Sequence, residues 1–126
     1  MSFYQLDHFV LTVSDLAATL QFYGEVLQMP IITFGGDRQA LQIGRQKINL
    51  HVAASPIVPH AHSPVPGSAD FCLITQTPLN ALINRLQSQG ISIELGPVER
   101  TGARGQLWSI YLRDPDGNLI EIANYQ

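Results

Sequence analysis

The sequence predicts an α+β fold made of two copies of one unit, each consisting of a strand, a helix and three further strands. Two observations carry this prediction. Alternating apolar runs and amphipathic stretches follow one another in the same order in both halves of the 126 residues. A stretch with four prolines, residues 53–68, separates the halves and lacks periodicity. We therefore expect one domain, 1–126, with a first repeat at about 4–54, a linker at 55–66 and a second repeat at about 67–126.

The first repeat opens with a strand at residues 6–13, in which apolar and other side chains alternate. His8 lies on the face of this strand opposite to Leu11. A helix is predicted over residues 14–29, because a Ser-Asp pair can cap its start, leucines recur at helical spacing and Pro30 ends it. Three short strands then follow, joined by glycine-containing turns, at residues 31–34, 38–43 and 47–52.

The second repeat has the same order of elements. Its strand, helix, strand and hairpin are expected at residues 67–75, 77–90, 91–97 and 106–125. The helix has Pro78 near its start and Gly90 at its end, as is typical of helix boundaries. The hairpin turns at Asp116 and Gly117. Cys72 lies in an apolar run, which favours a small buried hydrophobe over a reactive thiol.

The composition excludes several classes of partner. The formal net charge is −3 and the seven Lys and Arg residues are scattered, so no basic stripe is available for a phosphate backbone. The N-terminus lacks a positive patch followed by an apolar stretch, and no later run approaches membrane-spanning length. The single cysteine allows no internal disulfide. We expect a cytoplasmic protein that binds neither nucleic acid nor membrane.

Metal-capable side chains occupy matching positions in the two repeats. When LDHFVLT is placed over SADFCLIT, His8 lies opposite Asp70, each shortly before a helix. When INLHV is placed over LIEI, His51 lies opposite Glu121, each near the end of a last strand. Alternation puts both on the face away from the apolar side chains. If the two units curl into a half-barrel, these faces line its cleft, and the four residues form one site.

The group His8, His51 and Glu121 suits a divalent transition metal. Imidazole favours Zn, Ni, Fe or Co, and a carboxylate lowers the net charge of the site. Asp70 has two interpretations, either a fourth ligand oxygen or a carboxylate that orients a ligating histidine. For each residue alone, the alternative is a tolerated polar side chain on a half-exposed strand. The joint placement, rather than the spacing of any pair, predicts the site.

A basic stretch in the second repeat is a candidate for binding substrate. Arg100 and Arg104 lie in a glycine-containing segment typical of a flexible loop, where they could hold a carboxylate or phosphate. Arg38 is a further candidate of the same kind. The alternative is a solvated hairpin loop with surface arginines. His60 and His62, in the linker, are expected to lie on the surface and to take no part in metal binding.

Two segments carry a resemblance to a known family. The start of the chain, with His8 and the pair Phe22-Tyr23, reads LDHFVLTVSDLAATLQFYGEVLQM, and the end, with Glu121, reads YLRDPDGNLIEI. Over essentially its whole length the chain resembles the vicinal oxygen chelate superfamily, which includes glyoxalase I, fosfomycin-resistance proteins and extradiol dioxygenases. More narrowly, similarity to the glyoxalase domain-containing protein 5 branch is carried by PHAHSPVPGSADFCLIT and GPVERTGARGQLWSIYLRDPDGNLIEIANY.

The resemblance implies paired βαβββ modules with a divalent metal ion, Zn, Ni, Co, Fe or Mn, in their cleft. It also implies a homodimer in which one subunit gives His8 and His51 and its partner gives Asp70 and Glu121. In this family the metal takes two adjacent substrate oxygens and stabilises enolate charge. A carboxylate at the metal, here Glu121, exchanges a proton at the neighbouring carbon. The chain departs from the named enzymes at Asp70, where they place His or Glu, and in having its second histidine at position 51.

The leading functional hypothesis is a metal-dependent lyase or isomerase of glyoxalase type, similar to lactoylglutathione lyase, acting on a small α-oxygenated compound. An iron(II) extradiol dioxygenase is the first alternative, since two histidines and a carboxylate match the facial triad in composition. Asp70 in place of a histidine, and the lack of dedicated acid-base histidines, count against it. The second alternative is a non-enzymatic protein that sequesters a ligand, because some members of the family lack a metal.

Overall fold

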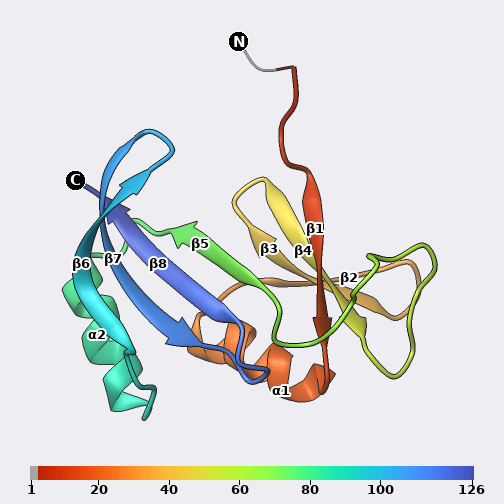
Figure 1. The fold of residues 1–126 in the computed structure, drawn as a ribbon. Helices are drawn as coiled ribbons and strands as arrows, with labels where there is room; N and C mark the ends of the chain where they lie inside the picture. The colour runs from red at the N-terminus through yellow and green to blue at the C-terminus, as the bar shows by residue number, and fades with distance from the viewer. Residues whose placement is uncertain (1–2) are drawn as a thin grey trace. The chain divides into compact units, whose positions relative to one another are not determined.

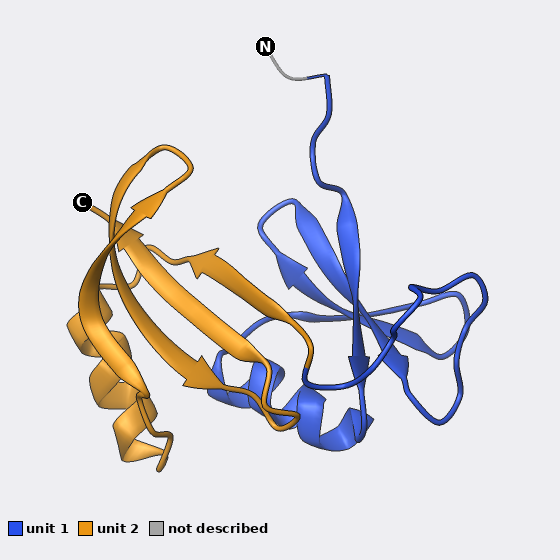
Figure 2. Ribbon diagram, viewed as in Figure 1, with its two compact units in different colours: residues 1–67 blue, residues 68–126 orange. Residues whose placement is uncertain are grey.

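The computed structural model describes residues 3–126, which form two compact units (Figure 2). Unit 1 comprises residues 1–67 and unit 2 residues 68–126. Each unit contains one four-stranded mixed sheet, with a helical segment inserted after its first strand (Figure 1). The predicted α+β class and its two βαβββ modules are confirmed. Among the helices of residues 3–126, none is both long and apolar enough to cross a membrane.

Unit 1 orders its strands β1-β4-β3-β2, so that its last strand pairs in parallel with its first. The strands follow the sequence prediction closely, with β1 at His8–Val13, β2 at Ile31–Phe34, β3 at Arg38–Ile43 and β4 at Gln46–Val52. Leu11, Ile48 and Leu50 lie on one face of the sheet and are buried. The helical segment contributes Phe22 and Tyr23 to the buried core. The opposite face carries the predicted ligands.

The helix of unit 1 begins as predicted and then widens. Asp15 caps α1, Leu16–Leu20, by accepting a backbone hydrogen bond of 3.1 Å. The next segment, Gln21–Val26, is a π-helix, closed by a hydrogen bond of 3.0 Å that spans five residues. Phe22 and Tyr23 are consecutive and both buried, and their rings pack edge to face with centroids 5.1 Å apart. The sequence pattern predicted the helix but not this change of pitch.

Unit 2 repeats the arrangement with the strand order β5-β8-β7-β6. Its elements are β5 at Asp70–Ile74, α2 at Leu79–Ser88, β6 at Leu95–Gly102, β7 at Gly105–Arg113 and β8 at Leu119–Tyr125. Helix α2 covers one face of this sheet, with Leu82 and Leu86 buried (Figure 1). Asn124 on β8 holds the start of the helix, because its side-chain oxygen accepts the Leu79 N–H at 2.8 Å. The face that α2 leaves uncovered carries Glu121.

One predicted strand is displaced towards the C-terminus. The sequence predicts a strand at 91–97, whereas β6 begins at Leu95 and continues past Pro97. Pro97 suggested a strand end, but β6 is an edge strand, where a missing N–H is tolerated. The pairing with β7 is irregular at this point. Gly96 is required there, because its φ is +113° and a Cβ would collide with the carbonyl oxygen of Ser109.

A buried Asp–Asn pair closes the turn between β7 and β8. Asp114 Oδ1 accepts the backbone N–H groups of Asp116 at 3.0 Å and of Asn118 at 2.9 Å. Asn118 Nδ2 donates to Asp114 Oδ2 at 2.8 Å, and Asn118 Oδ1 accepts the N–H of Ala69 at 2.9 Å. The predicted hairpin turn is confirmed, and the same network holds the residue that precedes β5.

Candidate functional site

Polar side chains gather on one face of the unit 1 sheet. His8 begins β1, while Asn49 and His51 lie two residues apart on β4. In the parallel pairing His8 is opposite Lys47, Val10 opposite Asn49, and Thr12 opposite His51. His8 is exposed, and its Nδ1 lies 2.7 Å from the carboxylate of Asp7. Nε2 is therefore the ring nitrogen that His8 can offer to a metal.

The strand register separates His8 from His51. His51 is level with Thr12, four residues beyond His8, which is roughly 13 Å along the strands at about 3.3 Å per residue. Side chains on one face of a sheet stand roughly parallel to one another, so two imidazoles at these levels would have to lean towards each other to hold one ion. The pairing of β1 with β4 therefore does not bring His8 and His51 side by side, and their sharing of a metal stays a prediction.

Asn49 is the polar residue on β4 that lies nearer to His8. Asn49 is paired with Val10, which is two residues after His8 on β1, and its side chain lies on the same face of the sheet as that of His8. Its side chain is buried, and its Oδ1 has no hydrogen-bond partner within residues 3–126. An unmet buried acceptor costs about 1–3 kcal/mol, which a cation would offset. Sequence reasoning overlooked Asn49, because an amide is an uncommon ligand of transition metals; the available signal was its shared face with His51.

Unit 2 places two carboxylates in the same relation. Asp70 is opposite Leu119 and Cys72 is opposite Glu121, so Asp70 and Glu121 lie two residues apart on adjacent parallel strands. In unit 1 that relation joins His8 with Asn49. The register makes Asn49 the equivalent of Glu121, whereas the sequence comparison had matched His51 to it. The correction is a shift of two residues along β4.

The thiol of Cys72 lies beside the carboxylate of Glu121. Cys72 is exposed, and its prediction as a buried hydrophobe was wrong, because it occupies the face of β5 that carries Asp70. Desolvation is the first cause that raises the pKa of Cys72 to about 12, and the charge of Glu121 and a hydrogen bond to its carboxylate raise it as well. The Cys72 thiol is therefore held in its neutral form beside Glu121.

Cys72 should react slowly with iodoacetamide despite its exposure. At pH 8 a thiol with a pKa of about 12 is ionised to roughly one part in 10⁴, against about a quarter for an ordinary cysteine. We expect an alkylation rate, followed by mass spectrometry, roughly 100-fold or more below that of a small-molecule thiol. Glu121→Gln should accelerate the reaction, since it removes a negative charge beside the thiolate. A native protein that reacts as fast as the free thiol would contradict this environment.

The predicted substrate arginines lie in a hairpin rather than in a flexible loop. Arg100 is within β6, and Arg104 is in the two-residue turn that joins β6 to β7. Of the two alternatives, the hairpin is the one observed, because glycines on both sides allow the strands to pair up to the turn. Arg100 Nε donates to the hydroxyl of Tyr111 at 2.9 Å, while the guanidinium of Arg104 lies 4.5 Å from the ring centroid of Tyr125. Arg100 and Glu121 line the same groove of about 370 Å³.

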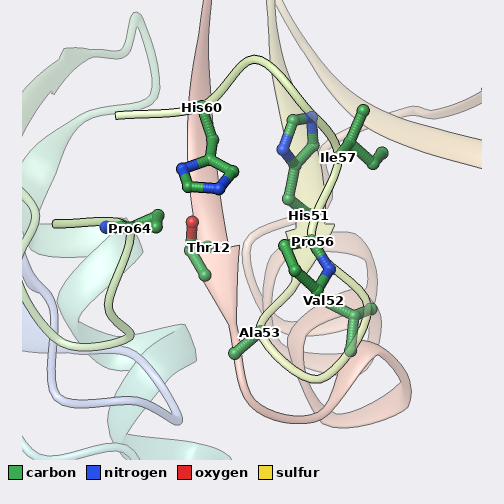
Figure 3. Close-up of a pocket in the computed structure, with 8 residues that line it drawn as sticks. All are labelled: Thr12, His51, Val52, Ala53, Pro56, Ile57, His60 and Pro64. Carbon is green, nitrogen blue, oxygen red and sulfur yellow. The ribbon is translucent and has the colours of Figure 1, made fainter. Parts of the chain in front are cut away.

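His51 has surroundings of its own in unit 1. It is 7% exposed, and its Nε2 has no hydrogen-bond partner within the described residues, 3–126. With Thr12 and His60 it lines a cavity of about 210 Å³ (Figure 3). Burial lowers the pKa of His51, and the charges of Arg38 and His60 lower it further. His60 is exposed, as expected of the linker, yet contributes to this cavity.

Each unit offers two of the donors that a divalent cation needs. Unit 1 has the imidazole of His8 and the amide oxygen of Asn49, and unit 2 has the carboxylates of Asp70 and Glu121. Within residues 3–126 no three His, Cys, Asp or Glu side chains come together as a possible metal site. Imidazole nitrogen and carboxylate oxygen are both donors that divalent ions accept, and the unmet Oδ1 of Asn49 would fit a cation.

The chain matches a family model and two curated relatives over most of its length. Residues 5–122 match the model described as the Glyoxalase/Bleomycin resistance protein/Dioxygenase superfamily. Virulence protein STM3117 of Salmonella typhimurium is 55% identical over 121 residues, covering 96% of this chain and 84% of the relative. Glyoxalase domain-containing protein RDO1 of Mycosarcoma maydis is 45% identical over 126 residues, covering 100% of this chain and 71% of the relative.

Solved structures share the fold. The crystal structure of STM3117 superposes with a TM-score of 0.95 at 54% identity and covers 100% of both chains. Lactoylglutathione lyase from Agrobacterium tumefaciens has a TM-score of 0.70 at 23% identity, covering 95% of this chain and 92% of that one. TnmS3, an antibiotic binding protein from Streptomyces sp. CB03234, has a TM-score of 0.75 at 22% identity, covering 100% of this chain and 99% of that one. At these lower identities the likeness concerns the fold alone.

Proposed function

Because the chain belongs to the glyoxalase/bleomycin resistance protein/dioxygenase superfamily, we propose that it is a metal-dependent lyase or isomerase of glyoxalase type that acts on a small α-oxygenated compound. The observation that carries the proposal is the repeated placement of donor side chains. His8 with Asn49 in unit 1, and Asp70 with Glu121 in unit 2, occupy the same register of first and last strands. A repeated backbone alone does not require a polar donor at all four positions.

The proposed functional unit is a cytoplasmic homodimer. One protomer supplies His8 and Asn49, and the partner subunit's Asp70 and Glu121 complete the set. The support for this assembly is that each unit by itself has two donors, whereas zinc sites in proteins take at least three protein ligands. Ni, Co, Zn, Fe and Mn are the candidate ions, since all accept nitrogen and oxygen ligands. His51 is left out of this set, because its level on β4 is too far from His8.

The chemistry follows from the residues around Glu121. When bound, a divalent ion supplies Lewis-acid stabilisation of the negative charge that develops on two adjacent substrate oxygens. Glu121 takes a proton from the substrate carbon and returns it to the neighbouring carbon, so that the carboxylate is regenerated. Cys72 is paired with Glu121 across the strands, and its neutral thiol adds no charge beside the carboxylate. Arg100, held by the Tyr111 hydroxyl, lines the same groove and can pair with a substrate carboxylate.

Metal-dependent proton exchange tests the proposal without knowledge of the natural substrate. The protein is stripped with a chelator, reloaded separately with Ni, Co, Zn, Fe(II) or Mn, and incubated in D₂O with α-hydroxyketones and with hemithioacetals of several thiols. We expect NMR to show exchange of the proton at the oxygen-bearing carbon with at least one metal. Glu121→Gln should reduce the rate roughly 100-fold to 10,000-fold, because it removes the base. Glu99→Gln, an exposed glutamate on β6, is the matched control and should retain the rate.

Three outcomes would contradict the proposal. If no metal form exchanges the proton of any compound in the panel, the proposed enolate chemistry is excluded. Oxygen-dependent ring cleavage of a catechol by the Fe(II) form would assign the chain to the extradiol dioxygenases. A protein that takes up no metal on titration and binds a compound without converting it would be a sequestering protein, as in the antibiotic binding protein that shares the fold.

A further inference from the structure

We propose that the cavity beside His51 is a second ligand site of this chain, which takes a small organic carboxylate. The cavity lies within unit 1, between β1, β4 and the linker that follows β4 (Figure 3). His51 enters it from β4 and His60 from the linker. Because His51 is four residues beyond the level of His8, this site is distinct from the proposed metal site. It does not depend on a bound metal.

The polar groups of the cavity provide hydrogen bonds for a ligand. His51 is more than nine-tenths buried, and its Nε2 has no hydrogen-bond partner within residues 3–126. A buried nitrogen in that state is costly, and the imidazole ring that carries it lines the cavity. His60 Nδ1 lies 2.8 Å from the carbonyl oxygen of Ala61, which can only accept, so Nδ1 carries a proton and Nε2 donates to a ligand only in the doubly protonated ring. The hydroxyl of Thr12 points towards the ring of His60 (Figure 3).

The charges around the cavity favour an anion over a cation. No Asp or Glu is among the described residues that line it. Arg38 precedes Gln39, the partner of Leu50, and so stands beside His51 on the neighbouring strand. Its positive charge acts on His51, as does that of His60 when protonated. A metal ion would have two imidazoles, no carboxylate and a repelling guanidinium. A carboxylate can accept from the Thr12 hydroxyl and from a ring N–H of His51, and the charge of Arg38 attracts it.

The remaining walls of the cavity set the size and the apolar part of the ligand. Pro56, Ile57 and Pro64 line it from the linker. Its volume of about 210 Å³ is below that of sites for drug-sized molecules, which begin at about 300 Å³. The ligand is therefore a carboxylate with one short aliphatic or aromatic group. The proline-rich linker, which looks like a mere connection in the sequence, forms a wall of the site.

NMR titration with butyrate and benzoate tests this site. The probes are compared with butyramide, benzamide and butylamine, which keep the shape and change the charge. We expect saturable shifts of the His51 ring and of the backbone amides of Ala53 and Ile57 with the carboxylates. The neutral amides should bind at least roughly tenfold more weakly, because hydrogen bonds to a charged group are the stronger ones.

Two variants locate the ligand. His51→Phe keeps a ring but removes both nitrogens, and Ile57→Asp adds a negative charge to the opposite wall without touching the histidine. Each should weaken carboxylate binding about tenfold or more, with the backbone amides as reporters. His62→Phe, on the same linker but outside the cavity lining, is the matched control and should bind as the native chain does. Backbone NMR spectra of all three variants establish that they fold.

Several results would overturn the proposal. One is that neither carboxylate gives a saturable shift. Another is that the amides bind as tightly as the carboxylates, or that butylamine binds more tightly than they do. A third is that both folded variants bind the carboxylates with native affinity. The titration is repeated on His8→Ala, which lacks a ligand of the proposed metal site. Carboxylate binding that disappears in His8→Ala would place the anion on the metal ion instead, whereas binding that persists separates the two sites even if the proposed reaction proves wrong.

Discussion

Replacing Glu121 by alanine should abolish metal retention while leaving the fold largely intact. The carboxylate is one of four proposed donors, and it is the one that also carries the proton transfer. Glu121 is half-buried on β8, and its neighbours Ile120 and Ile122 point to the opposite, buried face. Removing its side chain therefore spares the core. We expect at least about a 100-fold loss of metal affinity, since even residues that merely orient ligands contribute 10–100-fold.

Elemental analysis of protein purified in the presence of metal measures this effect, and circular dichroism checks the fold. His8→Ala should have the same consequence, since it removes the imidazole of the set. Glu99→Ala and His62→Ala, which change exposed residues away from the proposed donors, are the controls and should keep full stoichiometry. If a full equivalent of metal stays bound in Glu121→Ala or His8→Ala, the assigned site is wrong. Native metal content in His51→Phe would agree with the register of β4.

Asn118→Ala should be strongly destabilising, although Asn118 lies outside the proposed site. The Asn118 side chain is 1% exposed and joins the turn between β7 and β8 to the chain that enters β5. Its loss leaves the N–H of Ala69 and an oxygen of Asp114 without this partner. Each such group costs about 1–3 kcal/mol, so we expect the free energy of unfolding to fall by about 3 kcal/mol.

Urea unfolding of the apo protein, followed by circular dichroism, measures the change. The matched control is Asn84→Ala, on the exposed side of α2, which should change the free energy of unfolding by less than about 0.5 kcal/mol. A loss below about 1 kcal/mol in Asn118→Ala would mean that water replaces the network readily. The DPDGN segment would then matter for the turn alone and not for the position of Asp70.

Much of the fold could be predicted because the spacing of apolar side chains along a strand or a helix is a local property of the chain. Alternation in β1 and β4 identified the buried faces of Leu11 and Ile48, and glycines marked the turns of unit 1. Features that depend on neighbours in the tertiary structure could not be predicted from the sequence. The π-helical turn at Gln21–Val26 keeps two aromatic rings in the core, and the shift of β6 follows from its place at the edge of the sheet.

Cys72 illustrates the same limit at the scale of one side chain. Its apolar neighbours in FCLI suggested a buried position, but the strand carries two faces and only one of them lies under α2. Which face a residue takes follows from alternation, whereas what covers that face is decided by the tertiary packing. The sequence therefore identified the strand and not the surroundings of the thiol.

The sequence by itself determined the α+β class, the two βαβββ units and the face on which the candidate ligands lie. Only the tertiary structure decided which of those ligands stand level with one another. A shift of two residues along a strand keeps every side chain on its face, so alternation cannot distinguish Asn49 from His51 as the counterpart of Glu121. Hydrogen bonding between β1 and β4 makes that choice. It puts Asn49 close to His8 and leaves His51 to a cavity of its own.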